Sequence, residues 1–179
     1  AEAVRMTKAA KKAGATGTIV RTMKLATQAE GCAVDERTHR LYVSEEDVGL
    51  WRFDASAGGS TTPTRIASAD GYQIVADAEG VTLVAEGPEN DGYVIVSSQG
   101  DNSYAVYRLS DDGYVGRFRI APGAVGATEE TDGIDIAVGD FGPAYPGGLF
   151  VAQDGQNAPS AQNFKLAAWA DIKAALGIR

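Results

Sequence analysis

Residues 79–109 read EGVTLVAEGPENDGYVIVSSQGDNSYAVYRL, and this stretch decides the fold. It contains three short runs rich in β-branched and aromatic residues, separated by segments of Gly, Pro, Asn and Asp. That pattern is typical of consecutive β-strands joined by turns. The stretch opens on a carboxylate followed by a glycine, Glu79 and Gly80. It therefore predicts a unit of successive strands that begins on an acidic residue.

The same order of features occurs twice more in the chain. Residues 30–55 read EGCAVDERTHRLYVSEEDVGLWRFDA, and the third repeat begins DGIDIAVGDFGPAYPGGLFVAQDGQN at Asp132 and continues to QNFKLAAW. The three starts lie about 50 residues apart, a period typical of propeller blades. A fourth, more irregular strand fits at residues 64–69 and 114–121. A β-sandwich also has short strands, but it does not predict the repeated carboxylate and glycine, so we favour a β-propeller.

The sequence thus predicts an all-β chain that covers about three blades and part of a fourth. We expect the end of a preceding blade in residues 1–29, a blade in 30–78, another in 79–131, and the last blade with a C-terminal helix in 132–179. The helix is indicated by the spacing of Trp169, Ile172 and Leu176 before Gly177. Residues 1–14, which are rich in Ala and Lys, also permit a helix. Because a closed propeller needs roughly four to eight blades, we expect either a fragment or a ring completed by a second chain or copy.

Composition limits the function classes. The formal charge of -8 argues against binding to nucleic acid or to an anionic membrane surface, and no run approaches the length of a membrane span. One cysteine and one histidine cannot build a disulfide or a zinc cluster, and they disfavour nucleophiles of the Cys-His and Ser-His types. Cys32, beside Ala33 and Val34, is expected to be buried. The basic residues Arg21, Lys24, Arg52 and Lys165 are expected to be solvated or outer-strand charges.

Acidic residues recur at matching positions. Glu30, Glu79 and Asp132 open the three repeats, and innermost strands of propeller blades converge on one channel. Carboxylates at such short separations destabilise one another unless a cation lies among them. A second matching set follows the second strand of each repeat and offers only oxygen atoms: Glu45, Glu46, Asp47, Gln99, Asp101, Asn102, Asp154, Gln156 and Asn157. Oxygen ligands in loops favour Ca²⁺ over Mg²⁺, although acidic loop residues can also be simply solvated turns.

Several motifs in order resemble the C-terminal half of the β-propeller phytases, which are alkaline, calcium-dependent enzymes. These are QAEGCAVDE, LYVSEEDVGLWRFDA, DAEGVTL, YVIVSSQGDNSYAVY, ETDGID, FGPAYPGGLFVAQDGQN and QNFKLAAW, and together they cover about residues 17–169. The resemblance implies a six-bladed ring, a location that is secreted or periplasmic, and calcium ions that activate a water to release phosphate from phytate (myo-inositol hexakisphosphate).

The resemblance also implies site residues. Glu30, Glu79 and Asp132 are expected to be catalytic through the metal they hold. The metal ligands that the resemblance implies are Glu30, Glu46, Asp77, Glu79 and Asp132, and the second matching set adds Asp154 and Gln156 as expected ligands. Two positions depart from the family: Gly126 stands where an acidic residue is usual, and Gln156 where a glutamate is common. The alternatives are a calcium-stabilised propeller module without catalysis, or another propeller hydrolase such as a sugar lactonase.

Overall fold

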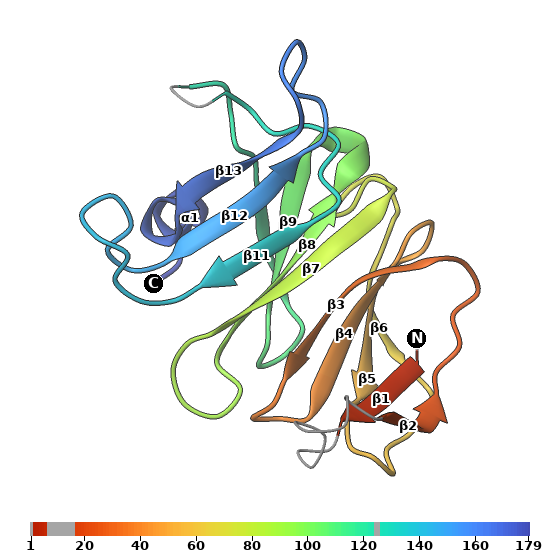
Figure 1. Ribbon diagram of the computed structural model, residues 1–179. Coiled ribbons are helices and arrows are strands. Elements are labelled where there is room, and N and C mark those ends of the chain that lie inside the picture. The colour runs from red at the N-terminus through yellow and green to blue at the C-terminus, as the bar shows by residue number, and fades with distance from the viewer. Residues whose placement is uncertain (1, 7–16, 124–125) are drawn as a thin grey trace, which may run out of the picture.

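The computed structural model describes residues 2–6, 17–123 and 126–179. Three antiparallel sheets, each with its strands in sequence order, form an arc (Figure 1). The first sheet contains β3 (Ala29–Asp35), β4 (Arg40–Glu45), β5 (Gly49–Asp54) and β6 (Thr64–Ser68). The second contains β7 (Ala78–Ala85), β8 (Gly92–Ser98), β9 (Ser103–Arg108) and β10 (Tyr114–Phe118). The third contains β11 (Ile134–Ala137), β12 (Leu149–Asp154) and β13 (Asn163–Ala168).

The all-β prediction is confirmed, and the sheets have the arrangement expected of part of a propeller. The irregular fourth strands expected at 64–69 and 114–121 are β6 and β10. The expected C-terminal helix is α1 (Trp169–Leu176), which ends where Gly177 adopts a left-handed φ of 67°. Within the described ranges, no helix has the length and hydropathy needed to cross a bilayer.

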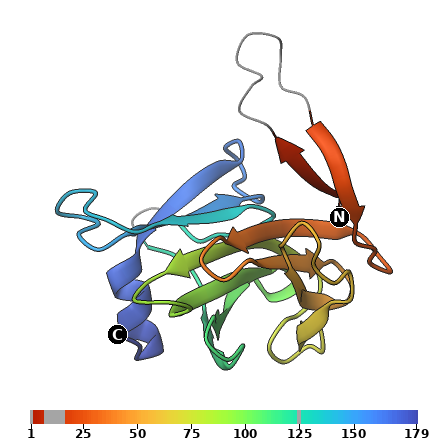
Figure 2. The same cartoon turned by 90° about the horizontal axis from the view of Figure 1, so that it is seen from below.

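The described part of the N-terminal segment is extended, although its composition also permits a helix. Residues 2–6 are not helical, because β1 (Glu2–Met6) pairs with β2 (Gly17–Thr22) as a two-stranded antiparallel sheet (Figure 2). Pairing between strands overrides the helix propensity of an Ala-rich segment. The rest of residues 1–14, whose composition permits a helix, lies outside the described residues.

The first strand of each sheet is its innermost strand. β7 lies between β3 and β11, as Figure 1 shows. The backbone N–H of Gly80 on β7 donates to the carbonyl of Asp132 (2.7 Å), and the N–H of Ala78 donates to the carbonyl of Glu46 (2.9 Å). The carboxylates that open the repeats are therefore carried to one end of three neighbouring inner strands.

The glycine after each carboxylate is explained by the close approach of these strands. A Cβ at Gly31 would lie 2.3 Å from the backbone nitrogen of Val81, and one at Gly80 would lie 2.4 Å from the carbonyl oxygen of Asp132. No side chain fits at either position. At Gly133, the third of these glycines, a Cβ would meet nothing within 4 Å among the described residues.

Apolar side chains fill the spaces between adjacent sheets. Tyr42 and Leu50 of the first sheet pack with Val94 and Val96 of the second. Between the second and third sheets, the aromatic side chains of Tyr104, Phe118 and Phe150 pack with centroid separations of 5.1 to 5.3 Å, and α1 adds Trp169 and Ile172. Each such buried side chain stabilises the fold by about 1.5–3 kcal/mol.

Each end of the arc presents apolar side chains to solvent. On the third sheet, Phe164 and Leu166 are 67% and 43% exposed, because they alternate with the buried Lys165 and with Ala167, which packs against the core shared with the second sheet. On the first sheet, Cys32 is exposed, so the prediction that it is buried is wrong. Its neighbour Ala33 packs toward the second sheet, and the alternation of a strand directs Cys32 to the opposite face.

Candidate metal centre

Three carboxylates meet at the start of the inner strands. Ligand oxygens of Glu30, Glu46 and Glu79 all lie within 4.8 Å of one another. Glu30 lies on β3, Glu79 lies on β7, and Glu46 follows β4 directly. The backbone contact between Ala78 and Glu46 holds the end of β4 beside the start of β7. Two sheets thus build one cluster, which we call the carboxylate cluster.

Nearby polar groups fix the cluster residues. The hydroxyl of Ser44 donates to the backbone carbonyl of Glu79, and the side-chain amide of Gln28 donates to the carboxylate of Glu30. Glu79 is only 8% exposed. Within the part of the chain that the structure describes, none of the ion pairs involves a cluster residue. Among the described residues, therefore, no lysine or arginine at contact distance balances the negative charge of the cluster.

The carboxylates repel one another, and their pKa values show it. Burial, together with the charges of Glu30 and Asp132, raises the pKa of Glu79 from 4.5 to about 7. Slight desolvation and the charge of Asp77 raise the pKa of Glu46. Asp77 and Asp132 are thus close enough to act on the cluster, although the close group itself consists of the three glutamates.

Asp132 is oriented by the second and third sheets together. The amide of Gln99 donates to its Oδ1 (2.9 Å), and its own backbone N–H donates to Oε1 of Gln153 (2.8 Å). Gln99 begins the short 3-10 turn after β8, at the same end of the sheet as Glu79. The carboxylate of Asp132 is therefore held at the cluster by a neutral donor.

Glu45 and Glu46 are neighbours with different roles. Glu45 is 1% exposed and accepts hydrogen bonds from the Trp51 indole (2.6 Å) and the Thr27 N–H (2.5 Å). Burial raises the pKa of Glu45, but the hydrogen bonds from Thr27 and Trp51 outweigh burial and hold it below its usual value. Glu45 is thus a structural carboxylate that ties β5 to the chain before β3.

The donor set of the carboxylate cluster fits a calcium ion. All its ligand atoms are oxygens from flexible side chains, as calcium prefers. A cation would remove the repulsion that raises the pKa of Glu79. Glu30, Glu46 and Glu79 would hold the ion, with Asp77 and Asp132 beside them.

The structure does not bring Asp154 and Gln156 to this cluster. Asp154 is 2% exposed, and its Oδ2 lies 3.1 Å from the ammonium of Lys165. Gln156 is exposed. Lys165 was expected to be a solvated or outer-strand charge. It does lie on β13, the outermost strand of the third sheet, but it is 6% exposed and so is not solvated. The sequence signal for its burial is the alternation in β13. Phe164 and Leu166 point outward, so Lys165 between them points to the buried face.

Sequence reasoning missed two arginines at the same end of the second sheet. Arg117 and Arg119, on and just after β10, reach Oδ2 of Asp101 at 2.8 and 3.1 Å. The other oxygen of Asp101 accepts the hydroxyls of Ser98 and Ser103. Asp101 is therefore already paired, and the exposed arginines place positive charge at this end of the sheet. In the sequence, Arg117 and Arg119 flank the apolar Phe118, and this alternation indicates that both arginines point away from the buried face of the strand.

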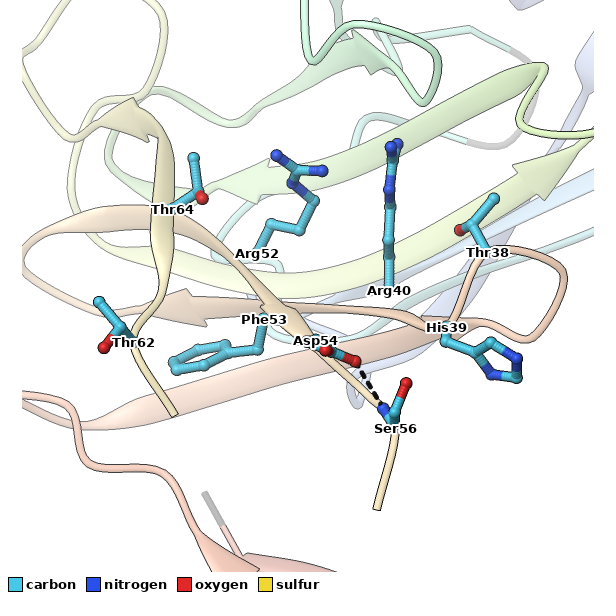
Figure 3. Close-up of a pocket in the computed structure, with 9 residues that line it drawn as sticks. All are labelled: Thr38, His39, Arg40, Arg52, Phe53, Asp54, Ser56, Thr62 and Thr64. Carbon is cyan, nitrogen blue, oxygen red and sulfur yellow. Dashed lines mark hydrogen bonds between the residues drawn. The ribbon is translucent and has the colours of Figure 1, made fainter. Parts of the chain in front are cut away.

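A polar pocket of about 400 Å³ lies at the opposite end of the first sheet (Figure 3). Arg40 pairs with Asp54 at this end, while Glu45 pairs with Gly49 at the other. Arg40 and Arg52 extend side by side in Figure 3. Arg40 donates to the carbonyl of Leu109 (2.6 Å), and Arg52 forms an ion pair with Asp112 (3.0 Å). These arginines join the first two sheets and belong to no part of the carboxylate cluster.

We expect the stability of the metal-free protein to fall as pH rises from 5 to 8. The pKa of Glu79 is about 7 when folded and 4.5 ordinarily, so between these values the folded state holds more protons than the unfolded state. Stability is then lost with rising pH, by up to about 3 kcal/mol. Thermal unfolding in a chelator at several pH values measures this. A difference between wild type and Glu79→Gln that does not change with pH would contradict it.

Comparisons with known proteins agree with these observations. A sequence model of the phytase family matches residues 6–179. A 3-phytase of Bacillus subtilis (strain 168) is 42% identical over 168 residues, which cover 90% of this chain and 44% of that relative. The chain therefore spans less than half the length of the relative. By the extent of the family match, the chain belongs to the phytase family.

Proposed function

We propose that this chain carries the calcium-binding part of an enzyme that releases phosphate from phytate. The observation that supports this best is the cluster of Glu30, Glu46 and Glu79, with ligand oxygens within 4.8 Å of one another, in a member of the phytase family. A calcium ion bound there would supply positive charge for phosphate oxygens and make a water molecule more acidic. A location that is secreted or periplasmic belongs to the same proposal.

The residues of the chain have distinct parts in this proposal. The three glutamates would hold a divalent cation. Glu79 would give up its proton on binding, since burial and unbalanced negative charge together raise its pKa to about 7. Gln99 holds the carboxylate of Asp132 in place. Arg117 and Arg119 offer positive charge to a substrate that carries several phosphates.

A second candidate is a calcium-stabilised module that does not turn over substrate alone. Two observations favour it. The matched residues make up only 44% of the relative's length, and the apolar residues Phe164 and Leu166 are exposed at one end of the arc. In this case a second chain or copy would complete the site.

Phosphate release from calcium phytate by the purified chain, with and without a chelator, tests the proposal. We expect release that stops on chelation and returns when calcium is added back in excess. The mass of the protein in solution is measured alongside, because it shows whether one chain or an assembly is active. A melting temperature that depends on calcium, without any phosphate release, would support the second candidate. If calcium changes neither the melting temperature nor phosphate release, both candidates are rejected.

A further inference from the structure

The ammonium of Lys165 lies in a site built entirely of oxygen atoms. It donates to Oδ1 of Asn163 (2.8 Å) and Oδ1 of Asn157 (3.2 Å), and it lies 3.1 Å from Oδ2 of Asp154. An ammonium has three N–H donors; two side-chain amide oxygens accept hydrogen bonds here, and the carboxylate of Asp154 forms an ion pair. The charge is therefore fully paired although Lys165 is only 6% exposed.

The other groups around this site also belong to the fold. Oδ1 of Asp154 accepts the backbone N–H of Glu129 (3.1 Å), so both carboxylate oxygens have partners. The amide nitrogen of Asn157 donates to the carbonyl of Ala161 (2.8 Å), which directs its oxygen to the ammonium. The loop between β12 and β13 is thus folded around the tip of Lys165.

Gly126 lies beside the lysine. A Cβ there would lie 3.7 Å from Cε and 3.8 Å from Nζ of Lys165. Position 126 thus adjoins the ammonium itself. A carboxylate at this position, together with Asp154, would bring two negative charges to the site, whereas Gly126 brings none. With Gly126, Asp154 and Lys165 the charges balance at zero.

We propose that Lys165 is the built-in cation of this oxygen site, so that the third sheet binds no metal ion here while the lysine is present. Removing the ammonium leaves the carboxylate of Asp154 and the amide oxygens of Asn157 and Asn163 facing one space. Carboxylate and amide oxygens are calcium ligands. The vacated site then takes one divalent cation. This inference does not depend on catalysis.

The test is the number of calcium ions bound per chain, measured by titration calorimetry with calcium chloride, and the melting temperature in chelator and in calcium chloride. All variants are made in a Glu79→Gln background, which weakens the carboxylate cluster. Lys165→Ala is compared with Lys165→Ala/Asp154→Asn. Lys24→Ala, at an exposed lysine, is the matched control.

We expect Lys165→Ala to melt about 10 °C lower in chelator, because it leaves a buried carboxylate unpaired. In calcium chloride it should bind one more ion than its parent and recover most of that loss. Adding Asp154→Asn should remove the extra ion. Lys24→Ala should match its parent in both measurements. Lys165→Ala that folds and binds no extra calcium overturns the proposal.

A second variant decides the matter if Lys165→Ala does not fold. Asn157→Ala, in the chain with Lys165 and Glu79 intact, removes one oxygen from the site on an accessible loop. If the lysine is the cation, the number of calcium ions bound stays the same. Loss of one ion would show that a metal binds at this loop and overturn the proposal.

Discussion

Glu79→Gln is expected to raise the melting temperature of the metal-free protein at pH 8 by about 8 °C and to remove most of its stabilisation by calcium. Glu79 is 8% exposed, and its pKa of about 7 means that ionisation at pH 8 opposes folding. A neutral amide of the same size avoids that cost. In the proposed function Glu79 is a calcium ligand, so on that proposal we expect phosphate release to fall about 100-fold.

The matched control is Glu36→Gln, which changes the same charge on an exposed turn away from the cluster. It should leave the pH dependence, the calcium shift and the phosphate release unchanged. Differential scanning calorimetry with chelator and with calcium chloride measures the first two. A Glu79→Gln protein that is less stable than wild type without metal at pH 8 would contradict the raised pKa of Glu79.

Gly80→Ala is expected to destabilise the chain by about 3 kcal/mol, because the added methyl group cannot fit between the second and third sheets. Its Cβ would lie 2.4 Å from the carbonyl oxygen of Asp132 and 2.9 Å from the backbone nitrogen of Ile134. Both are backbone atoms, so relief requires that the inner strands separate. The hydrogen bond from the Gly80 N–H to Asp132 would lengthen as they do.

Gly133→Ala is the control for this change, since it makes the same substitution after the next repeated carboxylate. Nothing lies within 4 Å of its Cβ position in the described part of the chain, and its backbone is not left-handed. We expect a change within about 0.5 kcal/mol in urea unfolding. Equal losses at Gly80 and Gly133 would show that the close approach of β7 and β11 is not the cause.

The sequence predicted the fold well because the relevant signals are local and repeated. Alternating apolar runs and turn residues located the strands, and the repeat of Glu30, Glu79 and Asp132 indicated which strands lie innermost. Strand pairing then brought Glu30, Glu46 and Glu79 together. The reason for the accompanying glycines became visible only with the contact between adjacent inner strands.

The errors concern which face of a strand is buried. Lys165 and Cys32 were assigned by residue type, yet in β13 and β3 the side toward the neighbouring sheet decides exposure. A lysine is rarely buried unless it is paired, and the partners Asp154, Asn157 and Asn163 lie on a loop and a strand whose approach no local pattern specifies. Residue types alone suggested a metal where the fold places an ammonium.

The exposed thiol of Cys32 is a labelling site on the outer face of the first sheet, the face directed away from the second sheet. The chain has one cysteine, so a maleimide dye attaches at a single, known position without any engineering. The rate of labelling therefore reports how much of that face is covered under any condition of calcium, substrate or protein concentration. Labelling of the Cys32 thiol thus allows the binding of another chain or copy to this face to be followed over time.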